Sequence, residues 1–226
     1  MIDFLENLQR TGERFIDVIA RSDRDALVPC CPGWLLRDLA LHQGHVWEWA
    51  RHCIEAGTHV DQSEESVIDE RLPAWLRDQL DALVGLLRAT DPEAPTWTFG
   101  PKPRLAAFWF RRQAHEVTVH LWDAESAVGT PHPISAELAA DGVDEVFTVF
   151  LPRQVRLERM AAVDEGVRIR LPDGRTYDIG DRASAEVTGD PSDLLLALWH
   201  RLPLDVLTIS GDVNAARTAF DRALTP

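Results

Sequence analysis

Residues 108–125 read FWFRRQAHEVTVHLWDAE, and this aromatic-rich stretch carries its polar side chains in two separate stripes. At about 100° per helical residue, Glu116, His120 and Asp123 fall within a narrow arc of one helix face. A second stripe lies on the opposite side of the helix and consists of Arg111, His115, Thr118 and Glu125. A helix packed in a bundle normally offers one face to water, so we expect one stripe to point inward.

A second helical segment indicates which stripe that is. Residues 31–49 open with a Pro-Gly turn, continue with helical periodicity and place His42 at the centre of their apolar face. A lone histidine in that position is more often a core residue bonded to a neighbour than a ligand. Together with Glu116 and His120, however, it could complete three ligands around an ion and leave one position open. The opposite stripe, with His115, is then expected to face water.

Length and composition limit the classes of function. The chain has 226 residues, 45% of them hydrophobic, and can bury a sizeable core. Its formal net charge is −14 and Lys102 is its only lysine, so binding to a phosphate backbone has no electrostatic support. The sequence shows neither a bilayer-spanning apolar run nor a signal peptide. We expect a cytoplasmic monomer or homodimer that binds neither nucleic acid nor membrane.

The three cysteines, Cys30, Cys31 and Cys53, are an odd number without CxxC spacing. This pattern argues against a disulfide framework or a zinc ribbon. As a nucleophile, Cys30 or Cys31 would need a nearby base and a lowered pKa. The simpler interpretation is that they are small, partly buried residues in a reducing compartment.

Hydrophobic periodicity divides the chain into a helical part and a mixed part. The helices expected in the first part span residues 1–21, about 34–52, 74–88, 104–128 and 135–150. The second part is expected to contain a hairpin over 167–179, strands at 185–188 and 206–210, and helices at 192–200 and 213–223. We therefore expect an α+β fold, with a helical bundle over 1–150 and a small α+β domain with a mostly antiparallel sheet over 151–226.

Several motifs resemble those of one family. They are Cys31-Pro-Gly-Trp with Asp38-Leu-Ala-Leu-His42, then His115-Glu-Val-Thr-Val-His-Leu-Trp-Asp-Ala-Glu125, then Thr188-Gly-Asp-Pro running to Trp-His-Arg201, and Ser210-Gly-Asp212. Over essentially its whole length the chain is similar to the mycothiol-dependent maleylpyruvate isomerase family. The resemblance implies a DinB-like metal-binding four-helix bundle followed by a sterol carrier protein-like α+β domain.

The resemblance also implies site residues. In that family a divalent ion, usually taken as zinc, is held by a histidine of the second helix and by the glutamate and last histidine of a His-Glu-x-x-x-His helix. By position these ligands are His42, Glu116 and His120. Asp123, one turn beyond, is expected to support a ligand or contact substrate. Arg201 matches a recurrent arginine that binds a carboxylate, although a cation near a helix C-terminus is an equally good explanation.

The activity implied is that of an enzyme using Zn²⁺ and mycothiol on an electrophilic small molecule such as an unsaturated oxo acid. Thiolate addition, bond rotation and elimination give cis/trans isomerisation, whereas addition alone gives an S-transferase. Arg112 is expected to bind the thiol cofactor or, like Arg201, a substrate carboxylate. Leu121 departs from the arginine of many relatives. Two alternatives remain: a non-catalytic metal-, thiol- or ligand-binding protein, and a non-haem Fe(II) enzyme at the same ligands.

Overall fold

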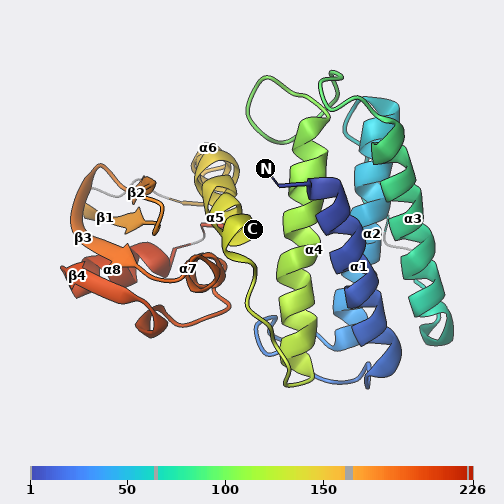
Figure 1. Ribbon diagram of the computed structural model, residues 1–226, viewed down its shortest axis with the longest axis horizontal. Helices are drawn as coiled ribbons and strands as arrows, with labels where there is room; N and C mark the ends of the chain where they lie inside the picture. Colours follow the sequence, from blue (N-terminus) through green and yellow to red (C-terminus); the bar gives the residue numbers. More distant parts are fainter. Residues whose placement is uncertain (1, 64–65, 161–164, 223, 226) are drawn as a thin grey trace. The chain divides into compact units, whose positions relative to one another are not determined.

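The computed structural model describes residues 2–63, 66–160, 165–222 and 224–225. The chain forms two compact units, Met1–His132 and Pro133–Pro226 (Figure 1). Two expected helix ends, Met1 and Ala223, lie outside the described residues. Within the described ranges, no helix combines the length and the apolar character that crossing a membrane requires.

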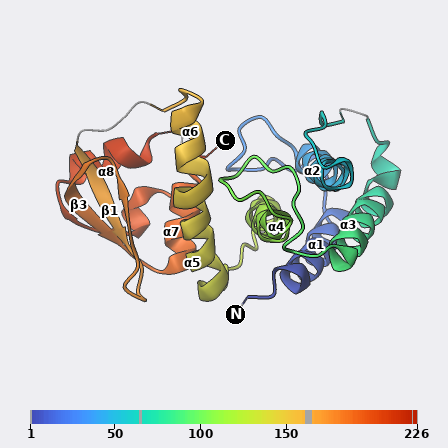
Figure 2. The same cartoon turned by 90° about the horizontal axis from the view of Figure 1, so that it is seen from above.

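The first unit is a bundle of four long helices, as the sequence predicts. These are α1 (Phe4–Arg21), α2 (Leu36–Ala56), α3 (Leu72–Ala89) and α4 (Ala107–Ala127). Figure 2 shows the bundle from above. Both α1 and α2 pack against α3 and against α4. Phe15, Trp47, Leu80 and Trp109 are fully buried among these helices. The seam between α2 and α4 is the part of the bundle that carries the candidate site.

Local signals set where the helices begin and end. Asp3 caps α1 by accepting a hydrogen bond from the backbone N–H of Glu6 at 2.9 Å. At the start of α2, Asp38 accepts one from the backbone N–H of Leu35, also at 2.9 Å. Gly57 ends α2 in the left-handed conformation, with φ of 65°. Pro73 occupies the first turn of α3, where its missing N–H costs no helical bond.

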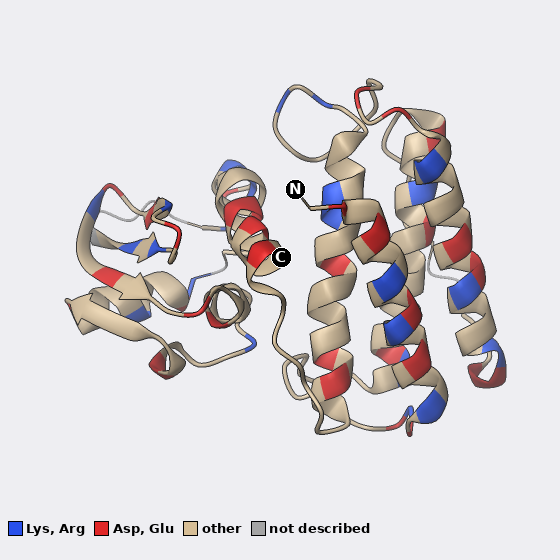
Figure 3. Cartoon of the chain, viewed as in Figure 1, with Lys and Arg blue, Asp and Glu red and all other residues tan. Residues whose placement is uncertain are grey.

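Charged side chains cover the outside of the bundle. In Figure 3, arginines are interspersed with Asp and Glu along α1 and α3. Arg21 and Asp17 form one such pair, 3.3 Å apart and one turn apart on α1. Exposed pairs of this kind contribute little to stability, so the apolar interior holds the bundle together.

At Gly44, the Trp75 ring of α3 lies directly against α2. A Cβ at Gly44 would lie 2.1 Å from that ring. We expect Gly44→Ala to lower the free energy of unfolding by about 1–3 kcal/mol, because the ring or the helix must move. Gly85→Ala in α3 is the control, since a Cβ there meets nothing within 4 Å. It should raise stability by about 0.5–1 kcal/mol. Urea unfolding measures both, and an undiminished stability of the Gly44 variant would contradict the close approach.

The second unit is a small α+β structure. Its helices are α5 (Ala136–Glu145), α6 (Leu151–Arg156), α7 (Pro191–Leu198) and α8 (Val213–Phe220). Its strands are β1 (Glu165–Arg170), β2 (Thr176–Ile179), β3 (Arg182–Thr188) and β4 (Thr208–Gly211). The strand order is β2-β1-β3-β4, and α8 packs against β1, β3 and β4. The pairs β1–β2 and β3–β4 are antiparallel and β1–β3 is parallel, which confirms the mostly antiparallel sheet.

Turn and cap residues also delimit the elements of this unit. Gly174, in the turn between β1 and β2, has a φ of 91° that favours glycine. Asp190 caps α7 by accepting a hydrogen bond from the backbone N–H of Ser192 at 2.9 Å. The last strand begins two residues later than predicted, because Leu204–Val206 form a 3₁₀ turn.

The boundary between the units lies at 132/133 and not at the expected 150/151. Helix α5 packs against α7, so it belongs to the second unit. Periodicity identifies its apolar side, including Leu138 and Val143, but an apolar side does not specify its neighbour. The helix also continues past the expected end, because a π turn over Val146–Phe150 leads directly into α6, with Pro152 in the first turn of α6.

Candidate metal centre

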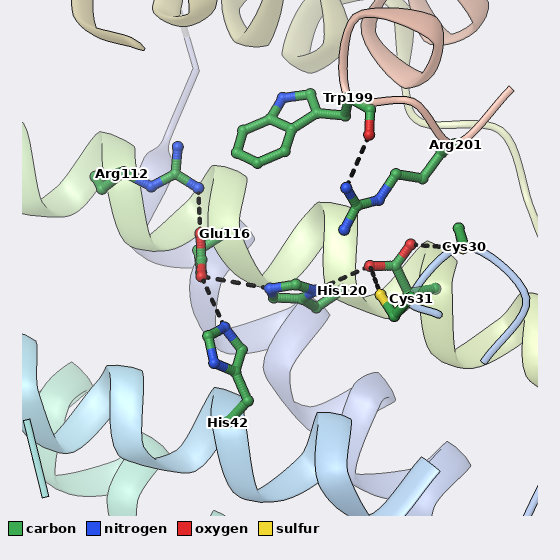
Figure 4. A network of polar contacts seen from close by, with 9 residues as sticks. Cys30, Cys31, His42, Arg112, Glu116, His120, Trp199 and Arg201 are labelled. Carbon is green, nitrogen blue, oxygen red and sulfur yellow. Dashed lines mark hydrogen bonds and ion pairs between the residues drawn. The ribbon is translucent and has the colours of Figure 1, made fainter. Parts of the chain in front are cut away.

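His42 of α2 and Glu116 and His120 of α4 point toward one another across the seam between the two helices (Figure 4). Nε2 of His42 lies 3.6 Å from Oε1 of Glu116, and Nε2 of His120 lies 3.4 Å from the same oxygen. One donor atom from each residue lies within 4.8 Å of the other two. In the part of the chain that the structure describes, no other group of three His, Cys, Asp or Glu side chains meets this condition.

Apolar neighbours fix the rotation of both helices. On α2, Leu39 and Val46 flank His42 and are at most 8% exposed. On α4, Val117 and Ala124 lie beside the polar stripe and are fully buried. Because these apolar side chains enter the bundle core, His42 of α2 and the Glu116 and His120 side chains of α4 are turned toward one another.

The two carboxylate oxygens of Glu116 have different partners. Oε1 faces both histidines, whereas Oε2 accepts a hydrogen bond from Nη2 of Arg112 at 2.6 Å. Burial alone would raise the pKa of Glu116, but Arg112 and the two histidines outweigh burial and hold it well below its usual value. The carboxylate is therefore anionic at neutral pH. Arg112, expected to bind the thiol cofactor or a carboxylate, is itself buried and contacts Glu116.

His120 is held by carboxylates on both sides of its ring. Nδ1 lies 2.9 Å from Oδ2 of Asp123, and Nε2 faces Glu116. Burial lowers the pKa of His120, but the hydrogen bonds to Asp123 and Glu116 outweigh burial and raise it to about 9. The Asp123 contact orients the ring so that Nε2 points at the Glu116 oxygen. An aspartate bonded to the far nitrogen of a histidine is a common support for metal-binding histidines.

The separations between Glu116 and the two histidines fit ligands of one divalent ion. Two ligand atoms about 2.1 Å from a tetrahedrally coordinated ion lie about 3.4 Å apart. The corresponding separations here are 3.4 and 3.6 Å. Two imidazoles with one carboxylate are also a donor set that leaves a position for an exchangeable ligand. The donor chemistry and the spacing thus support the same residues.

The expectation that His115 faces water is wrong. His115 is 2% exposed, and its ring packs edge-on against Phe4 of α1 with the ring centroids 5.8 Å apart. Glu125, lower on the same stripe, pairs with Arg14 of α1 at 2.5 Å. Helix α4 thus has polar neighbours on two sides, α2 and α1. The assumption that a bundle helix has only one buried polar face failed because α1 supplies a partner for the second stripe.

The contact of Asp123 with the two cysteines that precede α2 was not predicted from the sequence. Sγ of Cys30 lies 3.1 Å from Oδ1 of Asp123, and Sγ of Cys31 lies 3.8 Å from Oδ2. Cys31, burial and Asp123 together raise the pKa of Cys30 far above its usual value. This disfavours Cys30 as a thiolate nucleophile. The signal available in the sequence was the position of the pair, directly before the helix that carries His42.

Arg201 belongs to the second unit, where it follows α7. Its Nη1 donates a hydrogen bond to the carbonyl oxygen of Trp199 at 2.8 Å, and its guanidinium carbon lies 5.6 Å from the centroid of the Trp199 ring. Arg201 also lines a pocket of about 360 Å³ in this unit, together with His200 and Phe220. The arginine that was expected to bind a carboxylate is therefore beside a pocket.

Comparisons with known proteins cover both units. A model of the mycothiol maleylpyruvate isomerase N-terminal domain matches residues 5–125, and a model of the MDMPI C-terminal domain matches residues 137–218. No curated protein matches the chain significantly by sequence. A crystal structure of the mycothiol-dependent maleylpyruvate isomerase is similar, with a TM-score of 0.73, 16% identity, and coverage of 96% of this chain and 99% of that chain. A structure of a histidine-to-alanine mutant of that enzyme has a TM-score of 0.68 and 15% identity at the same coverage.

Proposed function

The chain belongs to the mycothiol maleylpyruvate isomerase family, and from this membership we propose that it is a metal-dependent enzyme that acts with mycothiol on an electrophilic small molecule. The observation that carries the proposal is the cluster of His42, Glu116 and His120, whose donor atoms lie within 4.8 Å of one another. We propose these three residues as the ligands of a divalent ion, with Zn²⁺ as the best match to the donor set. An ion held there would supply Lewis acidity that lowers the pKa of a bound thiol.

The residues around the ligands have supporting roles in this proposal. Arg112 binds one oxygen of Glu116 and leaves the other facing the histidines. Asp123 binds Nδ1 of His120 and so directs its Nε2 into the site. We assign Arg112 and Asp123 to the support of the ligands, because Arg112 contacts Glu116 and Asp123 contacts His120. Arg201 is proposed to bind a substrate carboxylate, which its position at a pocket of the second unit supports.

Two reactions follow from the same nucleophile. A thiolate adds to one carbon of an activated double bond, and the electron pair moves onto the activating carbonyl. Rotation about the resulting single bond and expulsion of the thiolate then give the trans isomer, with no net change in redox state or in thiol. If a proton is added instead and the carbon–sulfur bond remains, the product is a thioether. The first outcome is an isomerase and the second an S-transferase.

The concentration of free thiol during turnover distinguishes the isomerase from the S-transferase. Purified protein loaded with Zn²⁺ is incubated with mycothiol and a panel of cis-unsaturated oxo acids, and absorbance and free thiol are followed together. We expect turnover that depends on both the thiol and the metal. Substrate conversion at constant thiol identifies an isomerase, and equimolar loss of thiol identifies an S-transferase.

Other results would contradict the proposal. Ligand binding without turnover, in both the presence and the absence of thiol, would favour a binding protein. Oxygen consumption that requires added Fe(II) would favour iron chemistry at the same ligands, because two histidines and a carboxylate also suit Fe(II). Metal analysis of the purified protein accompanies each assay.

A further inference from the structure

The turn that precedes α2 is closed by backbone hydrogen bonds. Val28 N–H donates to the Trp34 carbonyl at 3.0 Å, and the N–H groups of Cys31 and Trp34 donate to the carbonyls of Val28 and Cys31 at 3.1 and 3.0 Å. Gly33 within it has a φ of 83°, a conformation that favours glycine. A bridge between Leu27 and Leu35 closes its base. These hydrogen bonds hold the turn in one conformation at the start of the helix that carries His42.

Two thiols of this turn reach the carboxylate behind His120. Cys30 donates to Oδ1 of Asp123 at 3.1 Å and Cys31 to Oδ2 at 3.8 Å. Nδ1 of His120 binds the same Oδ2 at 2.9 Å. The Asp123 side chain is fully buried, so its orientation is set by these contacts and not by bulk water. The raised pKa of Cys30 keeps that thiol protonated and able to donate.

The same turn also contacts the other histidine of the site. The Trp34 ring packs edge-on against His42, with the ring centroids 5.2 Å apart. The His42 and His120 rings also pack edge-on, with their centroids 5.0 Å apart. One short segment therefore contacts His42 through Trp34 and reaches His120 through Asp123.

We propose that Cys30 and Cys31 are positioning residues of the metal centre, whose thiols hold Asp123 in the orientation that directs His120 toward the ion. This inference rests on the proposed metal site and extends it to residues that touch no ligand. The thiols act as hydrogen-bond donors to a carboxylate, and no covalent step is involved. A serine hydroxyl donates to a carboxylate as well, whereas alanine does not.

The test compares Cys30→Ala/Cys31→Ala with Cys30→Ser/Cys31→Ser. Affinity for Zn²⁺ is measured by competition with a chromophoric chelator under reducing conditions, and thermal unfolding checks that each variant is folded. We expect the alanine variant to bind Zn²⁺ about 10–100-fold more weakly, the loss typical of removing an outer hydrogen-bond partner. The serine variant should retain most of the affinity. In an Asp123→Ala background the alanine substitutions should cause no further loss, because the thiols then have no carboxylate to hold.

A second measurement needs no metal. In ¹⁵N-labelled metal-free protein, the Nδ1–H of His120 should exchange slowly with water in the parent and serine variants and faster in the alanine variant. A parent protein that binds no Zn²⁺ would refute the proposed metal site, and the exchange rates would still decide the role of the thiols. Unchanged affinity together with unchanged exchange in the alanine variant would overturn the inference. An equal loss of affinity in the Asp123→Ala background would overturn it too, since the thiols would then act elsewhere.

Discussion

Replacing His120 by alanine is expected to abolish tight metal binding and all thiol-dependent turnover. Removal of an outer partner alone typically weakens a metal site about 10–100-fold, and loss of one of three protein ligands should cost at least another order of magnitude. The substitution also leaves Asp123 without its imidazole partner and Glu116 without one of its two histidines. His42→Ala should have a similar effect on the metal, because it removes the only donor from α2 in the cluster.

His115→Ala is a matched control for this prediction. His115 lies on the same helix, is also buried, and packs against Phe4 instead of the cluster. We expect it to lower thermal stability through lost packing while Zn²⁺ affinity stays that of the parent. Metal content after dialysis and competition for Zn²⁺ are measured for His115→Ala and for the two ligand variants. Full metal retention in His42→Ala and His120→Ala would exclude the three-ligand site, and equal losses in His115→Ala would assign the effect to folding.

Helical spacing predicted which side chains of each helix point inward, and the resemblance to the family implied that His42, Glu116 and His120 share one site. Residues 116 and 120 are one turn apart, so any α-helix places them on one face, and the apolar face around His42 turns that histidine inward. The structure brings the three side chains together at 3.4 and 3.6 Å. The bundle and the small α+β unit were predictable for the same reason, since their periodicity, turn and cap signals are all local.

Contacts between elements distant in the sequence were not predictable in this way. Cys30 and Asp123 are 93 residues apart. No spacing rule predicts which part of a distant helix a loop residue will contact. His115 was placed in water because its partner Phe4 lies on α1, whose orientation periodicity leaves open. The boundary at 132/133 was missed for the same reason, because the choice of neighbour for α5 is a tertiary contact.

Metal affinity is expected to rise steeply with pH in the neutral range. In the metal-free protein the hydrogen bonds of His120 to Asp123 and Glu116 outweigh burial and raise its pKa to about 9. His120 is then protonated at pH 7, and its Nε2 must release that proton to bind an ion. Below pH 9 the apparent affinity should therefore fall about tenfold per pH unit, or about a hundredfold from pH 8.5 to 6.5.

Proton release provides the direct measurement of this effect. Calorimetric titration with Zn²⁺ in buffers of different ionisation enthalpy should show about one proton released from His120 per ion near pH 7. Asp123→Asn should reduce both the release and the pH dependence, because it removes a charge that raises the pKa of His120. A pH-independent affinity between 6.5 and 8.5 would contradict a protonated His120 in the metal-free site.

Stability of the metal-free protein should change with pH in the opposite direction. The folded pKa of His120, about 9, exceeds the value of about 6.5 for an unperturbed histidine. Its contribution to stability is therefore fully present below pH 6.5 and is lost as pH rises through 9. Glu116, with a lowered pKa, contributes stability that is lost only in acid, as pH falls through its folded pKa. Urea unfolding of metal-free protein between pH 6.5 and 9 should thus show stability falling over the range in which affinity for Zn²⁺ rises. Both trends should persist in His115→Ala, and the stability trend should disappear in His120→Ala, because the His120 imidazole proton accounts for it.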